Sequence, residues 1–272
     1  MAGIEQKSFD APDDILKFEK GRLELLKMNK GLVRRLILEP GWCWTEHIRP
    51  YAGTELCESP RFQYHVSGSI HVKTRDGIQA EFQPGEVTTL TAGHDAWVVG
   101  DEPAVIIDWS GTIDYTAKRP LAVSEGRQSS SCEVMPYAVG GKEKGTASIE
   151  QKSFDLPDAV RPFENGKCEL LEFSQGVVGR LVLEPGWRWL HDVRHIVGTE
   201  LCEAPHFFYH VSGLFHVLMR DGTQVEVGPG EISALAAGHD AWVTGEEPVV
   251  LIDWAGAVNY AKRPENYVPA TR

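Results

Sequence analysis

The stretch "YHVSGLFHVLMRDG", residues 209–222, decides the fold class of this protein. An earlier copy, "YHVSGSIHVKTRDG", occupies residues 64–77. Both alternate apolar with polar positions and end in an Asp-Gly turn signal, a combination typical of β-strands joined as hairpins. Pro-Gly corners separate the neighbouring segments, which show the same alternation. The pattern predicts antiparallel β domains of the small-barrel or jelly-roll kind; only the segment after "SFDAPDD" is predicted to be a short helix, capped by Asp and opened by Pro.

The 272 residues contain a duplication. Residues 4–115 align without a gap onto residues 149–260 at a constant offset of 145, and roughly three positions in five are identical. The segment between the copies is dense in Ser and Gly and sustains no apolar period, as expected of a linker. We therefore predict two tandem domains, residues 1–120 and 149–272, joined by a linker over residues 121–148.

Composition excludes several classes of partner. The formal net charge is −12, and no cluster of Lys and Arg forms a stripe that would neutralise phosphates, so nucleic acid is not an expected partner. The N-terminus has no apolar signal region and no apolar run is long enough for a bilayer, so we expect a soluble cytoplasmic protein that does not bind membranes. Five cysteines are an odd count, and Cys57 and Cys202 are copies of one another, which favours reduced thiols over a disulfide framework.

The order of these signals in each copy resembles the cupin superfamily. The shared run is "YHVSG", the Asp-Gly hairpin, the "PGE" corner and a late "AGH", and two copies make the chain similar to a bicupin. The resemblance implies an all-β fold of two tandem cupin-type double-stranded β-helix (jelly-roll) barrels, commonly with a divalent metal held by three His and one Glu. Cupins include oxygenases, isomerases, decarboxylases, lyases, sugar binders and storage proteins, so the fold alone does not select a function.

The metal motif of that family falls on altered residues in copy two. Counting back from Gly213 places His206 at the Glu position of the motif, and Cys202 and Glu200 at its two His positions, while His239 follows the late Gly. Thiolate, imidazole and carboxylate are a plausible set of ligands for a late transition metal, so we expect one divalent ion (Fe, Zn, Mn, Ni or Cu) on Cys202, His206 and His239. No nucleotide or organic cofactor is indicated. The fourth ligand stays open among Glu200, the loop residues His191, Asp192 and His195, and water.

Copy one carries a weaker version of this site, because Arg61 stands where copy two has His206. A guanidinium cannot ligate a metal, although it can grip an anionic ligand. Each Cys can equally be a buried small hydrophobe without chemistry. The candidates for a second metal site are His47, Glu55, Cys57 and His94, and the predicted pocket residues are Arg61, His65, Trp97 and Trp242.

These residues point to a metal-dependent enzyme that acts on a small organic molecule, with the better site in copy two. The leading reaction class is of the non-haem oxygenase type, an oxidoreductase in which Asp240, His210 or His195 moves protons. The alternatives are a metal-dependent lyase or isomerase, and a binding or sensory bicupin without turnover. We expect a monomer or a homodimer of pseudo-symmetric bicupins. The sequence does not identify the substrate.

Overall fold

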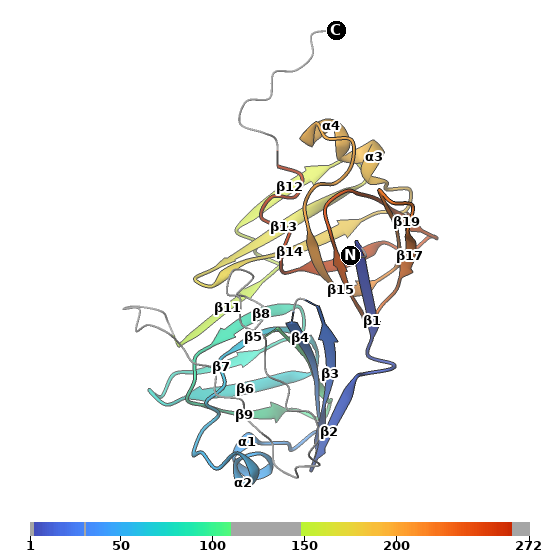
Figure 1. Ribbon diagram of the computed structural model, residues 1–272. Coiled ribbons are helices and arrows are strands. Elements are labelled where there is room, and N and C mark those ends of the chain that lie inside the picture. The colour runs from blue at the N-terminus through green and yellow to red at the C-terminus, as the bar shows by residue number, and fades with distance from the viewer. Residues whose placement is uncertain (1–2, 30, 110–147, 263–272) are drawn as a thin grey trace. The chain divides into compact units, whose positions relative to one another are not determined.

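The computed structural model describes residues 3–29, 31–109 and 148–262 (Figure 1). The chain divides into two compact units. Barrel 1 is Phe9–Ser153, and barrel 2 is Phe154–Arg272 together with Met1–Ser8. The predicted end of the first domain, residue 120, lies outside the described residues. So does the predicted linker, except for Ser148. Regular structure is almost entirely strand, as predicted.

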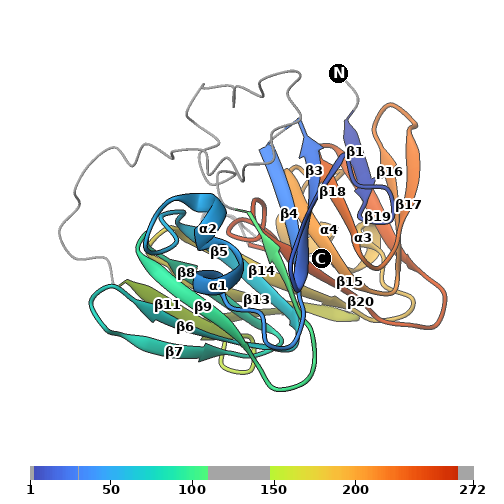
Figure 2. The same ribbon diagram turned by 90° about the horizontal axis from the view of Figure 1, so that it is seen from below.

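Barrel 2 consists of two antiparallel sheets, most of whose strands are labelled in Figure 2. The larger one has seven strands, and the smaller one has three. The larger sheet runs β1 (Ile4–Ser8), β18 (Glu231–Leu235), β15 (His206–Ser212), β20 (Val249–Asp253), β14 (Gly176–Leu183), β13 (Gly166–Phe173) and β12 (Ala159–Phe163). The smaller sheet runs β17 (Gln224–Val227), β16 (Leu214–Met219) and β19 (His239–Thr244).

Barrel 1 repeats this arrangement strand for strand. Its seven-stranded sheet runs β11 (Ile149–Ser153), β8 (Glu86–Leu90), β5 (Arg61–Ser67), β10 (Ala104–Asp108), β4 (Gly31–Leu38), β3 (Gly21–Met28) and β2 (Asp14–Phe18). Its three-stranded sheet runs β7 (Gln79–Phe82), β6 (Ser69–Thr74) and β9 (His94–Val99). The two barrels therefore share one topology, as expected of a duplicated sequence.

The first strand of each repeat belongs to the other repeat's barrel. β1 pairs with β18 in the register Ile4 to Leu235, and β11 pairs with β8 in the equivalent register, Ile149 to Leu90. Both strands have the sequence "IEQKS", so each presents the same side chains to its partner. The compact units consequently differ from the sequence repeats by one exchanged strand.

The hairpin that decides the fold class shows the predicted alternation. In β16, Phe215, Val217 and Met219 are buried, and the residues between them are less so. Gly213, between β15 and β16, has a φ of +72°, and a Cβ there would lie 2.7 Å from the Pro248 carbonyl oxygen. Only glycine fits this corner without strain, so the chain can turn sharply from one sheet into the other.

The helices differ from the prediction. The segment after "SFDAPDD" is strand β2, because pairing with β3 outweighs the local capping signals, and the predicted helix there is wrong. Four short helices lie instead in the segments that follow "EPGW", and α1 contacts β9 (Figure 1). No helix in the described part of the chain is long and apolar enough to cross a membrane. The helices are α1 (Trp44–His47), α2 (Arg49–Ala52), α3 (Trp189–Asp192) and α4 (Arg194–Val197).

Candidate metal centre

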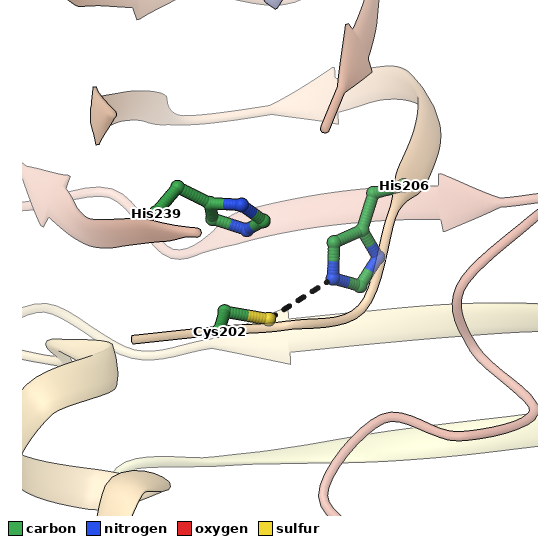
Figure 3. A group of neighbouring side chains, drawn as sticks. All are labelled: Cys202, His206 and His239. Atoms are coloured by element: carbon green, nitrogen blue, oxygen red, sulfur yellow. Dashed lines mark hydrogen bonds between the residues drawn. The ribbon is translucent and has the colours of Figure 1, made fainter. Parts of the chain in front are cut away.

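Three predicted metal ligands meet inside barrel 2. The ligand atoms of Cys202, His206 and His239 all lie within 4.8 Å of one another. Figure 3 shows the three side chains pointing toward a common centre. All three residues are at most 3% exposed. Among the described residues no other group of three His, Cys, Asp or Glu has a spacing that fits a metal ion.

Backbone pairing brings these residues together. Cys202 lies outside the named strands but forms an isolated bridge with His239, in which the Cys202 N–H donates to the His239 carbonyl oxygen at 2.8 Å. His239 is the first residue of β19, and His206 is the first residue of β15. The site is therefore built where two strands begin and where a loop is fastened to one of them.

Each histidine is oriented by a hydrogen bond through its Nδ1 atom. His239 Nδ1 lies 2.8 Å from the Ala236 carbonyl oxygen, which can only accept, so Nδ1 donates and Nε2 keeps its lone pair. His206 Nδ1 lies 2.7 Å from Asp253 Oδ2, and its Nε2 lies 3.5 Å from Cys202 Sγ. Both rings thus present Nε2 to the centre, as a metal ligand supported by an outer partner does.

Asp253 contacts the candidate centre through His206, and our sequence reasoning missed it. It is the last residue of β20 and is fully buried. One signal was available, since "IDW" occurs in both copies and places a carboxylate at the end of an apolar strand. A buried carboxylate requires a partner, but the sequence cannot name one that lies 47 positions away.

The thiol and the imidazole perturb each other's pKa. Burial acts to raise the pKa of Cys202, but hydrogen bonds to His206 and His239 outweigh it and lower the pKa to about 6. Burial acts to lower the pKa of His206, but the charge of Asp253 outweighs it and raises the pKa to about 10. The site therefore favours the thiolate, which is the form that binds metals.

The spacing of the donor atoms fits a shared ion. A tetrahedral centre with metal–sulfur and metal–nitrogen bonds of about 2.3 Å and about 2.1 Å separates the two donors by about 3.6 Å. The distance from Cys202 Sγ to His206 Nε2 is 3.5 Å. Three protein ligands leave a fourth position open, as in catalytic rather than structural zinc sites.

Aromatic side chains enclose His206. The Phe208 ring stacks on it at 4.7 Å between centroids, and the Tyr260 ring meets it edge-on at 5.4 Å. Tyr260 is 3% exposed, and its hydroxyl has no hydrogen-bond partner among the described residues. Burial, followed by the charge of Cys202, raises the pKa of Tyr260 well above its usual value. The hydroxyl is thus a neutral, unused donor close to the centre.

The segment after β20 is held over this site by a single arginine. Arg161 donates hydrogen bonds to the carbonyl oxygens of Ala257, Val258 and Tyr260 at 2.7–3.1 Å. A Cβ on Gly256 would lie 2.4 Å from His206 Nδ1, so the backbone of this segment runs directly against the ring. Arg161 therefore fixes the covering of the centre.

The other predicted ligands of copy two lie outside this group. Glu200, His191 and His195 are exposed. Asp192 is buried, but its carboxylate accepts the Arg188 N–H at 2.7 Å and the Asn165 side-chain amide at 3.2 Å. Asp192 thereby fastens the first turn of α3.

The three predicted proton carriers are also separate from it. Asp240 is buried and accepts two bonds from the Arg188 guanidinium, at 2.7 Å and 2.8 Å. His210 Nε2 lies 2.7 Å from Ser233 Oγ, and burial lowers the pKa of His210 to about 3, so this ring is neutral. His195, in α4, is exposed, and its Nδ1 lies 3.1 Å from the carbonyl oxygen of His191 in α3.

In barrel 1 a guanidinium takes the place of the imidazole. Arg61 Nη1 donates to Asp108 Oδ2 at 2.7 Å, and Arg61 Nη2 lies 3.5 Å from Cys57 Sγ. Cys57 bridges to His94 as Cys202 does to His239. Burial acts to raise the pKa of Cys57, but Arg61 and His94 outweigh it and lower the pKa to about 6. In barrel 1 a Cys, a His and an Asp therefore surround the permanently charged Arg61, as the same residue types surround His206 in barrel 2.

The remaining predicted residues of copy one are dispersed. Glu55 is exposed, whereas His47 is buried with Nδ1 bonded to the backbone of Cys43. His65 is buried, with Nε2 at 2.9 Å from Thr88 Oγ1. Of the four candidates for a second metal site, the fold brings together Cys57 and His94.

The two predicted pocket tryptophans lie on the outer faces of their strands. Trp97 stacks on His71 at 4.5 Å, and Trp242 stacks on His216 at 4.2 Å, and both tryptophans are half-buried. Side chains alternate along β9, so its neighbour Ala96 lines the interior in place of Trp97.

No protein-family model matches the chain, and no curated protein matches it in sequence. Solved structures do match it. An oxalate decarboxylase from Lactobacillus farciminis, in a formate complex, has a TM-score of 0.58 and 14% identity over 91% of this chain and 84% of that chain. A mutant of the Bacillus subtilis oxalate decarboxylase has a TM-score of 0.59 and 14% identity over 94% of this chain and 78% of that chain. At this identity the similarity establishes the fold, and the two tandem cupin-type barrels predicted from the sequence are confirmed.

Proposed function

We propose that the protein is a metal-dependent cupin enzyme that acts on a small organic molecule. One divalent transition metal would be held by Cys202, His206 and His239 in barrel 2. The observation that carries the proposal is the convergence of one thiol and two oriented Nε2 atoms within 4.8 Å. A bound metal would polarise a substrate oxygen and, if redox-active, would exchange electrons with substrate or O2.

The residues around the ligands have separate roles in this proposal. Asp253 holds the proton on His206 Nδ1 and orients the ring so that Nε2 faces the centre, where a bound metal would displace the Nε2 proton. Phe208 and Tyr260 exclude water from one side of the site. The Tyr260 hydroxyl, which has no partner in the described structure, is the group that we propose donates a hydrogen bond to a substrate oxygen.

An oxygenase-type reaction is the leading class. Thiolate and imidazole ligands suit redox-active late transition metals, and the buried, aromatic surroundings suit chemistry that water would interrupt. The second candidate is a metal-dependent lyase, and the observation that favours it is that the two oxalate decarboxylases share the tandem fold of this chain. The two classes differ in their need for O2.

We also infer a reducing compartment, as in the cytoplasm. Cys43, Cys57, Cys168 and Cys202, the four cysteines in the described residues, are all free. Free thiols, one of them at the proposed centre, are maintained where glutathione and thioredoxin keep cysteines reduced. Copurification of the native protein with a cytosolic marker tests this location.

Elemental analysis tests the metal centre. Protein purified without an affinity tag and reconstituted with Fe(II), Zn(II) or Mn(II) should hold about one ion per chain. Cys202→Ser should lose the ion, and the matched variant Cys57→Ser should keep it. A folded chain that holds no metal after reconstitution, or a stoichiometry that follows Cys57, contradicts the proposal.

Turnover distinguishes the two reaction classes. The metal-loaded enzyme is supplied with small carboxylic acids, oxalate first, in aerobic and in anaerobic solution. Consumption of O2 that depends on substrate supports the oxygenase class. Release of CO2 without O2 consumption supports the lyase class, and the absence of both argues against these acids as substrates.

A further inference from the structure

Barrel 1 has a pocket where barrel 2 has its candidate metal centre. The pocket has a volume of about 40 Å³. Its polar end is formed by Cys57, Arg61, Gln63 and His94, and the remaining wall is aliphatic and aromatic. It contains the guanidinium at the position where copy two has an imidazole ligand.

Gln63 is the residue that indicates a ligand. It is 6% exposed and lines the pocket, and it makes no hydrogen bond to any residue that the structure describes. A buried amide without a partner is unfavourable unless a water or a ligand satisfies its hydrogen bonds. At the same position barrel 2 has Phe208, whose ring packs on His206. The glutamine thus presents an amide donor and acceptor to the pocket of barrel 1.

Arg61 has hydrogen-bonding capacity to spare. Two of its five N–H groups point to Asp108 and Cys57, and the structure gives the guanidinium no other partner among the described residues. Three of its N–H groups therefore stay available to donate to a ligand in the pocket.

The volume limits the size of the ligand. One water-sized group needs about 10–15 Å³ of cavity volume. The pocket therefore holds about three such groups. A carboxylate of one or two carbons has three or four non-hydrogen atoms. Its two oxygens match the guanidinium and the amide, and its carbon end matches the apolar wall.

We propose that barrel 1 binds a small carboxylate, of the size of formate or acetate, without a metal. Arg61 and Gln63 donate hydrogen bonds to its oxygens, and Trp42 and Trp44 form part of the apolar wall. This site does not depend on the metal centre proposed for barrel 2.

Titration of the full chain with formate and with acetate tests the proposal. The protein is stripped of metal and kept at about pH 6, where both ligands are ionised. Sodium chloride holds the ionic strength constant, and binding is followed by calorimetry and by saturation-transfer NMR. We expect one saturable site per chain in the range of roughly 0.1–10 mM, as such small ligands allow. Acetamide, which has the same shape without the charge, should bind at least about tenfold more weakly.

Variants locate the site. Gln63→Leu removes the amide at similar volume and should weaken binding about tenfold, and Gln63→Phe, which copies barrel 2, should abolish it. Gln83→Leu alters an exposed glutamine of the same barrel and should change nothing. Cys202→Ser should also leave binding unchanged, which separates this site from the metal proposal.

Three results would overturn the proposal. They are the absence of saturable binding by either carboxylate, equal binding of acetamide, and binding that persists in a folded Gln63→Phe variant. If Gln63→Phe does not fold, Gln63→Leu takes its place, because leucine adds no bulk to the pocket. Undiminished binding by Gln63→Leu would then overturn the proposal.

Discussion

Position 206 lies between a thiol and a carboxylate, and position 61 lies between the same two kinds of group. His206 contacts Cys202 and Asp253, while Arg61 contacts Cys57 and Asp108. An imidazole in this setting offers a lone pair to a metal, whereas a guanidinium supplies a permanent cation and no lone pair. The side chain at this position therefore decides whether the barrel can offer a third metal ligand.

Arg61→His should create a second metal centre. Cys57, His94 and Asp108 already stand where copy two has its ligands and its supporting carboxylate, so the metal content should rise from about one to about two ions per chain. Elemental analysis measures this. Arg61→Gln is the control and should stay at about one, and an unchanged metal content in a folded Arg61→His variant would show that the position is not equivalent.

The buried histidines should make stability depend on pH. Burial lowers the pKa of His65 from 6.5 to about 3. Between these pH values His65 binds a proton in the unfolded chain but not in the folded chain. The stability that this ring contributes is fully present above about pH 6.5 and is lost as the pH falls toward 3, by about 2 kcal/mol at pH 5. The free energy of unfolding, measured with urea, should fall between pH 7 and pH 5 in both proteins. The fall should be about 2 kcal/mol smaller in His65→Met than in the parent. His195→Gln, at an exposed site, should keep the parental loss, and an equal loss in all three proteins would disprove the assignment.

Among the elements, the ends of the strands position the residues of the candidate centre. His206 and His239 each begin a strand, Asp253 ends one, and Cys202 bridges to the start of β19. Residues at strand ends are held in place by the sheet. The segment after β20 then covers the site, and Arg161 holds it by three backbone carbonyls.

Arg161→Leu should loosen this covering segment. The change introduces the residue that copy one has at the equivalent position, Leu16, and removes three hydrogen bonds. Amide hydrogen exchange over residues 255–261 should accelerate about tenfold or more, while exchange in β15 stays unchanged. Acceleration spread over the whole of barrel 2 would indicate general destabilisation and would contradict a local role.

At the scale of the whole molecule, the barrels are completed by exchanged strands. β1 and β11 have one sequence and occupy equivalent registers, so pairing chemistry alone does not decide which barrel each strand joins. The path of the chain decides it. An edge left open by a missing strand would expose unpaired N–H and C=O groups along β18 or β8.

The second repeat alone should therefore dimerise. In a chain of residues 149–272, β11 of each copy can pair with β18 of the other, as β1 does in the full protein. Sedimentation analysis should give a dimer. The same fragment with Gln151→Pro, which breaks the ladder of β11, should be monomeric or unfolded, and a stable monomer of the unaltered fragment would show that β11 can close its own barrel.

The sequence by itself determined the duplication, the β class and which Cys and His residues converge in barrel 2. Alternation of period two, Asp-Gly and Pro-Gly turns and the spacing of Cys202, His206 and Gly213 are local features, and local features are written directly in the order of residues. His239 was also found in this way, because it follows a glycine at a fixed place after the hairpin. These patterns indicate which side chains lie on the same face of a strand or a hairpin.

Only the tertiary structure decided the rest. It paired Asp253 with His206, left Gln63 without a partner in a pocket, turned Trp97 outward and exchanged β1 with β11. It also converted the predicted helix after "SFDAPDD" into a strand. Each of these outcomes depends on contacts between residues far apart in the chain, whose energies come from burial and pairing and leave no periodic trace in the local sequence.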